Sequence, residues 1–159
     1  MLTVIGVDPG LAGTGVAVVG GRGMTVDRYA YGSISTTRDK ALAERLGCIY
    51  DGLLAVIRDE SPDLMIVEEA FSLEKYPKSG ITLGKVTGVI LLAGQQAGIP
   101  VTEIPVREAK KILTGNGSAD KSQLEMAVRR FLGIPGCIRP FHASDALALA
   151  LIGLFRHPV

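Results

Sequence analysis

Carboxylates stand at the ends of three strongly apolar segments of this chain. Asp8 closes the apolar run at positions 4–7, Glu68 closes the run at 64–67, and Asp145 opens a third apolar stretch. A buried, unpaired charge is costly, so acids at the ends of core elements predict a site where a bound cation balances them. Hard oxygen ligands of this kind suit Mg²⁺ or Mn²⁺.

The order of apolar patterns predicts one α/β domain over residues 1–159, with a mixed five-stranded sheet flanked by helices. The first three strands are expected to form an antiparallel meander. Strands are predicted at 2–8, 13–19, 24–34, 64–68 and 101–104. Helices are predicted at 38–60, about 80–96, 105–113, 118–132 and 142–155, and a mobile loop at 69–79.

Charge and cysteine content limit the classes of function. The net charge of +1 gives no global basic signature, which counts against a nucleic-acid substrate but leaves room for a local basic face. No apolar run reaches the roughly 20 residues that a membrane span needs. Cys48 and Cys137 have no metal-ligand spacing, and no signal peptide precedes them. We therefore expect a cytoplasmic protein with reduced thiols.

His142 and Asp145 are three residues apart in a predicted helix and therefore lie on one helix face. Together with Asp8 and Glu68 they could hold two divalent ions roughly 3.5–4 Å apart, the arrangement for in-line displacement at phosphorus. Each residue alone also has an ordinary interpretation. Asp8 could be a turn residue, Glu68 a solvated acid, and the His142–Asp145 pair a helix cap, since acids favour the N-terminal end of a helix.

Several motifs, in order along nearly the whole chain, resemble the RuvC family of Holliday-junction resolvases. The first alone is weak, but the full set at these separations is specific. The matching segments are residues 4–15, 66–71, 83–84, 88–89, 115–123 and 143–148.

The resemblance implies a ribonuclease H-like fold and a homodimer that resolves four-way DNA junctions by symmetric paired nicks, in recombination and repair. It also implies two Mg²⁺ or Mn²⁺ ions per active site and a partnership with the RuvA–RuvB branch-migration complex. By match, Asp8, Glu68 and Asp145 are metal ligands. His142 stands where many members carry aspartate. A neutral imidazole still binds a metal, and it suits Mn²⁺ better than Mg²⁺.

Contacts to DNA are expected outside the metal site. Lys110 and Lys121 match family positions that bind phosphates, and Phe71 matches an aromatic residue that wedges into the junction. The predicted loop and the helix after it are locally basic, with Tyr76 among the lysines, which suits contact with a DNA strand. These lysines are Lys75, Lys78 and Lys85. From the residues alone, a solvated lysine or a core phenylalanine remains an equally simple interpretation.

Other functions stay open at this point. The Asp8-Pro9-Gly10 turn also fits the phosphate loop of an actin-like kinase or ATPase, although such enzymes need two domains of this kind. A ribonuclease H-like nuclease acting on RNA and a catalytically weak junction-binding module are further alternatives. The helix at 80–96 carries more apolar surface than one sheet face needs, which predicts a two-fold dimer interface there.

Overall fold

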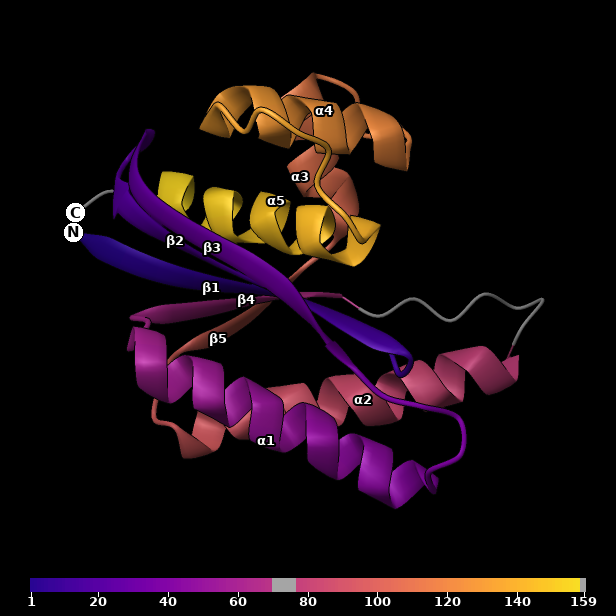
Figure 1. Ribbon diagram of the computed structural model, residues 1–159. Helices are drawn as coiled ribbons and strands as arrows, with labels where there is room; N and C mark the ends of the chain where they lie inside the picture. The colour runs from indigo at the N-terminus through magenta and orange to yellow at the C-terminus, as the bar shows by residue number, and fades with distance from the viewer. Residues whose placement is uncertain (70–76, 158–159) are drawn as a thin grey trace.

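The computed structural model describes residues 1–69 and 77–157, and its centre is a twisted five-stranded sheet (Figure 1). The strands lie in the order β3-β2-β1-β4-β5. The first three form an antiparallel meander, whereas β4 pairs parallel to β1 and β5 parallel to β4. The sheet is mixed, as the sequence predicts. The strands are Leu2–Asp8 (β1), Gly13–Arg22 (β2), Thr25–Ser35 (β3), Leu64–Glu68 (β4) and Val101–Ile104 (β5).

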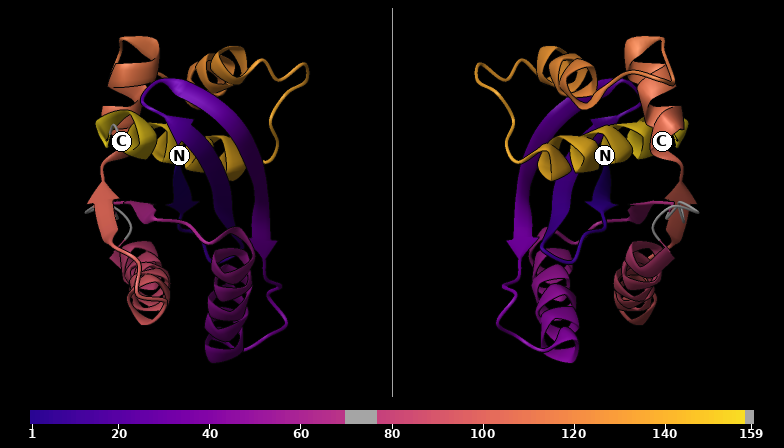
Figure 2. Two further views of the ribbon diagram at one scale, coloured as in Figure 1. Left: turned by 90° about the vertical axis from the view of Figure 1, so that its left-hand side faces the viewer. Right: turned by 90° about the vertical axis from the view of Figure 1, so that its right-hand side faces the viewer.

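Helices cover both faces of this sheet (Figures 1 and 2). One face is covered by α1 and α2, which pack against each other. The other face is covered by α5, and α3 and α4 pack on α5 from outside. The helices are Leu42–Glu60 (α1), Pro77–Gln96 (α2), Val106–Thr114 (α3), Lys121–Leu132 (α4) and Phe141–Arg156 (α5).

The predicted elements all form, but several boundaries differ by up to four residues. β2 continues to Arg22 instead of ending at 19, and α4 begins at Lys121 instead of 118. The helix predicted from residue 38 begins at Leu42, where Glu44 accepts a hydrogen bond from the N–H of Ala41 and so satisfies a free donor at the helix start. The loop predicted at 69–79 is too long, because α2 already begins at Pro77. Proline favours a first helical position, where its missing N–H is not needed.

Helix α5 lies unusually close to the sheet. All residues from Ala143 to Leu154 are buried, and glycines make this approach feasible. A side-chain carbon at Gly6 would lie 2.1 Å from the carbonyl oxygen of Ala146, and one at Gly15 would lie 2.0 Å from that of His142. Glycine on β1 and β2 therefore sets how deeply α5 sits. Although α5 is very apolar, no helix in the described ranges has the length and apolarity to cross a bilayer.

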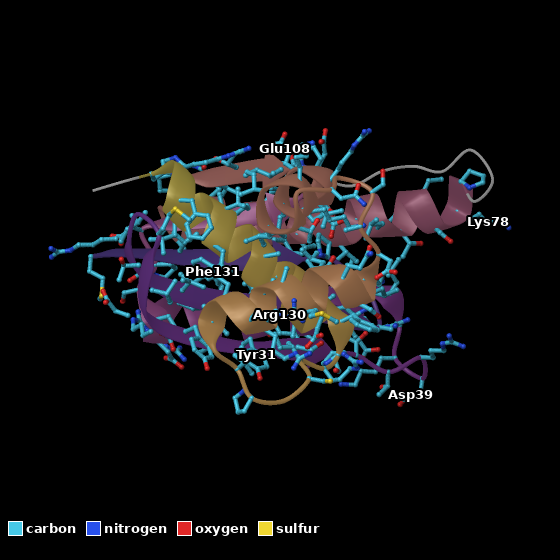
Figure 3. All side chains as sticks on the ribbon, turned by 90° about the horizontal axis from the view of Figure 1, so that it is seen from above. Tyr31, Asp39, Lys78, Glu108, Arg130 and Phe131 are labelled. Carbon is cyan, nitrogen blue, oxygen red and sulfur yellow. The ribbon has the colours of Figure 1, made fainter. Side chains whose placement is uncertain are left out.

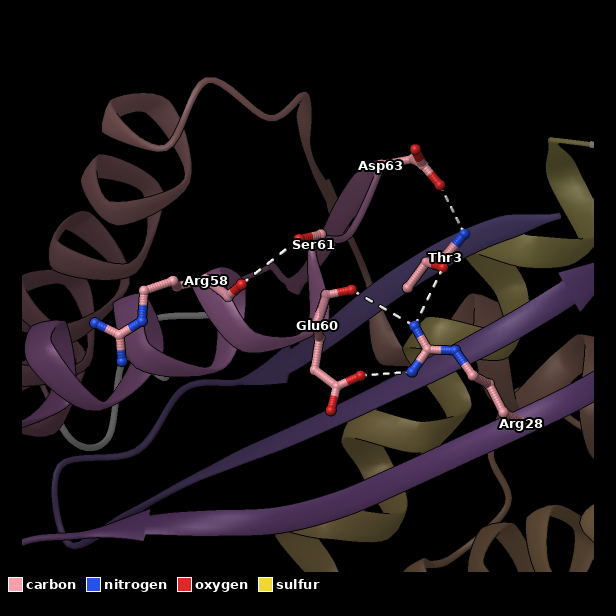
Figure 4. A network of polar contacts seen from close by, with 6 residues as sticks. All are labelled: Thr3, Arg28, Arg58, Glu60, Ser61 and Asp63. Atoms are coloured by element: carbon pink, nitrogen blue, oxygen red, sulfur yellow. Dashed lines mark hydrogen bonds and ion pairs between the residues drawn. The ribbon is translucent and has the colours of Figure 1, made fainter.

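The opposite face is more conventional and is secured at one end by a polar network (Figure 4). Ile49, Leu53 and Ile57 form the buried stripe of α1. At the end of this helix, Arg28 of β3 donates to Glu60 and, at 3.4 Å, to the hydroxyl of Thr3. Asp63 accepts from the N–H of Thr3 at 2.8 Å. These bonds connect the edge strand, the central strand and α1.

Candidate active site

The strand pairing brings Asp8 and Glu68 together. β1 and β4 are parallel neighbours, and Val7 is in register with Val67, so the acids that follow them leave the sheet side by side. Asp8 is also paired with Gly15 of β2, directly under the first turn of α5. That turn carries His142, and Asp145 follows one turn later. All four residues predicted for the metal site therefore meet at one end of the sheet.

The closest contact in this cluster joins α5 to β1. Nδ1 of His142 lies 2.9 Å from Oδ2 of Asp8. Asp8 and Asp145 are buried, with exposed fractions of 6% and 7%, whereas the side chain of His142 is 40% exposed. The capping interpretation of His142 is wrong, because its side chain is directed to Asp8 and the N-cap of α5 is Pro140. The cluster thus has a buried floor and an open side.

The carboxylates strongly disfavour one another's charge. Burial raises the pKa of Glu68 to about 9, with further contributions from hydrogen bonding to Asp8 and from the charges of Asp8 and Asp145. Burial and the charge of Asp8 raise the pKa of Asp145 to about 6. At pH 7 without a cation, Glu68 therefore holds a proton. Structures that push acid pKa values this far are typical of functional sites.

Cationic groups act in the opposite direction. The hydrogen bond to Asp8 raises the pKa of His142 above its usual value near 6.5, against the effect of burial. Lys121 lowers the pKa values of Glu68, His142 and Asp145, and Lys110 lowers that of Asp145. Both lysines are therefore close enough to influence the acids.

The donor set fits a divalent cation. Three carboxylates and one imidazole supply hard oxygen ligands and one borderline nitrogen ligand. A cation would also offset the burial and the carboxylate repulsion that together raise the pKa values of Glu68 and Asp145. Among the described residues, no three acid, histidine or cysteine side chains are already arranged as a metal site. An ion held by Asp8 would therefore replace the bonds of Asp8 to His142 and Glu68.

The predicted DNA-contacting residues fall into three groups. Phe71 and Lys75 lie outside the described residues. Lys78 and Lys85 are exposed on α2, and Lys78 extends from the N-terminal end of that helix (Figure 3). Lys78 also lines a shallow groove with Leu11, three residues after Asp8. Lys110 is on α3, and Lys121 is the first residue of α4.

Sequence reasoning missed the residues that hold the turn after Asp8. The hydroxyl of Thr14 donates to the carbonyl of Gly10 at 2.7 Å. The hydroxyl of Thr36 donates to the carbonyl of Leu11, and Arg45 donates to Thr36 at 2.8 Å. Thr14 lies in the Gly-Thr-Gly segment that opens β2, which was a usable signal. The Thr36–Arg45 contact depends on how α1 docks and has no local signature.

A second missed residue supports the start of α5. Glu125 of α4 is 4% exposed and accepts a hydrogen bond from the N–H of Ile138 at 2.9 Å. Arg129 lies 3.1 Å from the same carboxylate oxygen. Ile138 belongs to the segment that leads into α5, so Glu125 fixes the chain just before Phe141 and His142. The i, i+4 spacing of Glu125 and Arg129 was the only sequence signal.

Comparison with known proteins gives consistent matches. Residues 4–153 match the family model described as crossover junction endodeoxyribonuclease RuvC. The RuvC of Rhodopirellula baltica is 39% identical over 150 residues, covering 94% of this chain and 84% of the relative.

Among solved structures, Thermus thermophilus RuvC in complex with a Holliday junction substrate superposes with a TM-score of 0.89 at 31% identity. The match covers 98% of this chain and 94% of that one. The yeast mitochondrial Holliday junction resolvase Ydc2 shares the fold, with a TM-score of 0.61 at 9% identity, over 96% of this chain and 78% of that one. The predicted ribonuclease H-like architecture is thereby confirmed.

Proposed function

This chain belongs to the RuvC family of crossover junction endodeoxyribonucleases, and we propose that Asp8, Glu68, His142 and Asp145 are its catalytic, metal-binding residues. The protein is a nuclease that resolves four-way DNA junctions, with a role in recombination and repair. It depends on a divalent metal, as the family does. The alternatives, an RNA nuclease or a weak junction-binding module, have no comparable support, and residues 1–159 are proposed to act as one nuclease domain.

The observation that carries the assignment is the 2.9 Å contact between His142 and Asp8 beside the two acids with raised pKa values. Residues from β1, β4 and α5, far apart in sequence, meet there although their charges repel. Two divalent ions, Mg²⁺ or Mn²⁺, would supply charge at the attacking and the leaving oxygen atoms. Asp8, Glu68, His142 and Asp145 would hold these ions, and the exposed side of His142 leaves the cluster open to them.

The chain's own residues have distinct parts in this proposal. Glu68 must release its proton and His142 must be neutral before either can act as a ligand. Asp8, which bonds to both of them, would give up these hydrogen bonds to hold the ion. Lys110 and Lys121, which already lower the pKa values of the acids, hold the phosphates on either side of the bond that breaks. Buried Asp145 fixes the inner wall of the site.

The other proposed contacts to DNA also come from residues outside the metal site. Lys78 and Lys85 are seven residues apart and therefore lie on one face of α2, where both are exposed. We propose that this face binds the phosphates of one arm of the junction. Phe71 and Lys75, by resemblance to the family, would contact the unpaired strands at the centre of the junction.

Homodimerisation is proposed through α2. Of the apolar residues predicted for the interface, Val86, Ile90 and Ala93 are buried within the chain, whereas Ile81 and Leu92 are 62% and 49% exposed. Ile81 and Leu92 are eleven residues apart, which brings them to the same face after three turns. A two-fold axis along this face would direct two sites at opposite strands. Sedimentation should give a dimer at micromolar concentration, and a fully active monomer would exclude this interface.

Cleavage of a defined set of nucleic acids tests the function itself. A four-way junction, a linear duplex of the same sequence and a structured RNA are each incubated with Mg²⁺ or Mn²⁺. We expect paired nicks in the junction and little cleavage of the other two. Equal cleavage of RNA would favour the RNA nuclease, and binding without cleavage would favour the junction-binding module. Partnership with the RuvA–RuvB complex is proposed on the resemblance alone, and a cytoplasmic location is proposed on the free thiols of Cys48 and Cys137.

A further inference from the structure

The two edges of the sheet differ greatly in length and protection. β5 closes one edge with four residues, whereas β3 closes the other with eleven (Figure 2). Every residue of β3 from Asp27 to Gly32 is exposed. Because β3 pairs only with β2, its outer backbone N–H and C=O groups have no strand partner in the part of the chain that the structure describes. Such groups are a template for another strand.

A groove lies beside this free edge, on the face of the sheet that α1 covers. Val16 is in register with Gly32 and Val18 with Ala30, so these four residues share one face. The two valines form the floor, and Val56 of α1 forms the far wall. The groove has a volume of about 280 Å³. It exists because Ala30 and Gly32 have almost no side chain, and a side-chain carbon at Gly32 would meet nothing within 4 Å.

Both ends of the groove are closed by contacts between β3 and α1. At one end Ile34 packs on Gly52, where an added side-chain carbon would lie 3.1 Å from Ile34. At the other end Arg28 is paired with Glu60 (Figure 4). The side chains on either side thus reach α1, while the two between them leave a gap. The length of the groove is therefore set by Ala30 and Gly32, which lie between the two closed ends.

The segment that borders the groove has none of the usual protection of an edge strand. Tyr29 to Ile34 contains no charged residue and no proline, and the nearest charge, Arg28, is already paired with Glu60. On the opposite face of the strand, Tyr29 and Tyr31 stack with ring centroids 6.4 Å apart and are each 40% exposed. Natural edges of this length are normally blunted by charge, proline or a bulge. The one register shift between β2 and β3 leaves Asp27 of β3 without a partner, two residues before this segment.

We propose that β3 binds an extended peptide by strand addition, with one aliphatic side chain of the peptide in the groove over Val16 and Val18. The free backbone edge specifies the partner as a strand, and the apolar groove specifies small aliphatic residues at alternate positions. DNA does not suit this surface, because Arg28, the cation at its end, is neutralised by Glu60. The groove itself lies on the α1 face of the sheet, opposite α5, but Ser33 at its border is in register with Gly15, which closely approaches the carbonyl oxygen of His142.

Selection from a library of random peptides tests this proposal. Peptides of about eight residues, enough for one strand, are displayed and selected against the whole chain. The Gly32→Leu variant puts a side chain into the groove, and its first carbon meets nothing within 4 Å. Gly47→Leu on α1 is the matched control, since an added side-chain carbon at Gly47 also meets nothing within 4 Å. Binding of individual labelled peptides is then measured by fluorescence anisotropy.

We expect selected peptides with Val, Ile or Leu at alternate positions. Gly32→Leu should weaken their binding about tenfold or more, the effect of excluding one aliphatic side chain, and Gly47→Leu should leave it unchanged. Backbone N-methylation of the peptide should abolish binding at every second position and leave it unchanged at the positions between them. Only the N–H groups on one edge of the peptide form hydrogen bonds to β3. Junction cleavage by Gly32→Leu should equal that of the unaltered protein.

Three outcomes would overturn the proposal. The first is the absence of any selected peptide whose binding depends on Gly32. The second is self-association of the chain that Gly32→Leu abolishes, which would assign the edge to a second copy. The third is weaker junction binding by Gly32→Leu, which would assign the surface to DNA. Ala30→Glu, which puts a charge into the same groove, must give the same result as Gly32→Leu in each measurement.

Discussion

The two faces of the sheet are built in different ways. On the face under α5, the helix backbone packs directly on the strand backbone, because Gly6 and Gly15 have no side chain to separate α5 from β1 and β2. The face under α1 and α2 is held by ordinary side-chain packing, with Ile49 and Ile90 among its buried residues. On α5 all positions from Ala143 to Leu154 are buried, whereas α2 buries only five of its residues.

This difference matches the division of labour in the proposed site. The acids come from β1, β4 and the rigid, deeply buried α5, where positions tolerate little displacement. The proposed contacts to DNA come from exposed helix faces on α2, α3 and α4, where a long lysine side chain can adapt to the substrate. The following predictions test this contrast.

The largest effect is expected where charge at the buried site is removed. Asp8→Asn and Asp145→Asn should each lower cleavage by a factor on the order of a thousand, because a metal supplies several kcal/mol of transition-state stabilisation. Junction affinity should stay within about threefold, since lysines rather than acids hold the phosphates. Asp39→Asn, on an exposed turn, is the control. Near-normal cleavage by either site variant would remove that residue from the mechanism.

A smaller but still large effect is expected from glycine substitutions on the two faces. Gly15→Ala puts a methyl group into the carbonyl of His142 and should destabilise the fold by about 3 kcal/mol, while displacing His142 from Asp8. Gly47→Ala, in the exposed part of α1, should stabilise it by about 0.5–1 kcal/mol. Urea denaturation measures both. Equal effects would contradict the claim that the α5 face is the rigid one.

Replacing a lysine should weaken junction binding, whereas replacing an acid should lower cleavage and leave binding nearly unchanged. Lys121→Ala should weaken junction binding roughly tenfold at low salt and lower the slope of log affinity against log salt by about 1. Lys40→Ala, at an exposed position just before α1, is the control. Filter binding over a salt series checks this. An unchanged salt slope for Lys121→Ala would mean that Lys121 touches no phosphate.

The smallest effect is expected on the preference between Mg²⁺ and Mn²⁺ when His142 is replaced. His142→Asp restores a hard oxygen ligand and one negative charge, so the ratio of Mg²⁺-supported to Mn²⁺-supported cleavage should rise, by about tenfold. His142→Ala should weaken cleavage with both ions. The test is a metal titration of cleavage for the three proteins at one pH. Identical curves would leave His142 without a role in the site.

Much of the fold and of the candidate site was predictable from the sequence. The remainder was not predictable, because it depends on how the elements pack. The segments before Asp8 and Glu68 are short apolar runs, so the sequence predicted that both are buried strands. The meeting of Asp8 with His142 was expected, but its distance depends on Gly15, whose role appears only when α5 is docked. An ordinary histidine ligand would lose metal affinity as the pH falls through about 6.5. Because Asp8 raises the pKa of His142 and burial raises that of Glu68, this loss is expected at a higher pH.

The same pKa shifts make the metal-free fold sensitive to pH. Glu68 binds its proton more tightly in the folded chain than in the unfolded one, so its contribution to stability is present below about pH 4.5 and is lost as pH rises toward about 9. His142 has the same sign, with its contribution lost above its ordinary value of 6.5. A bound cation reverses this dependence, because it binds the deprotonated forms of both groups.

Calorimetric titration of the DNA-free protein with Mn²⁺, in buffers of different ionisation enthalpy, tests the central claim most directly. If Asp8, Glu68, His142 and Asp145 form one cation site, binding at pH 7 must release protons, and affinity must rise as pH increases from about 6 to about 9. Glu68→Gln should bind Mn²⁺ at least about tenfold more weakly and release fewer protons. Equal affinity and equal proton release in the unaltered protein and Glu68→Gln would contradict the account.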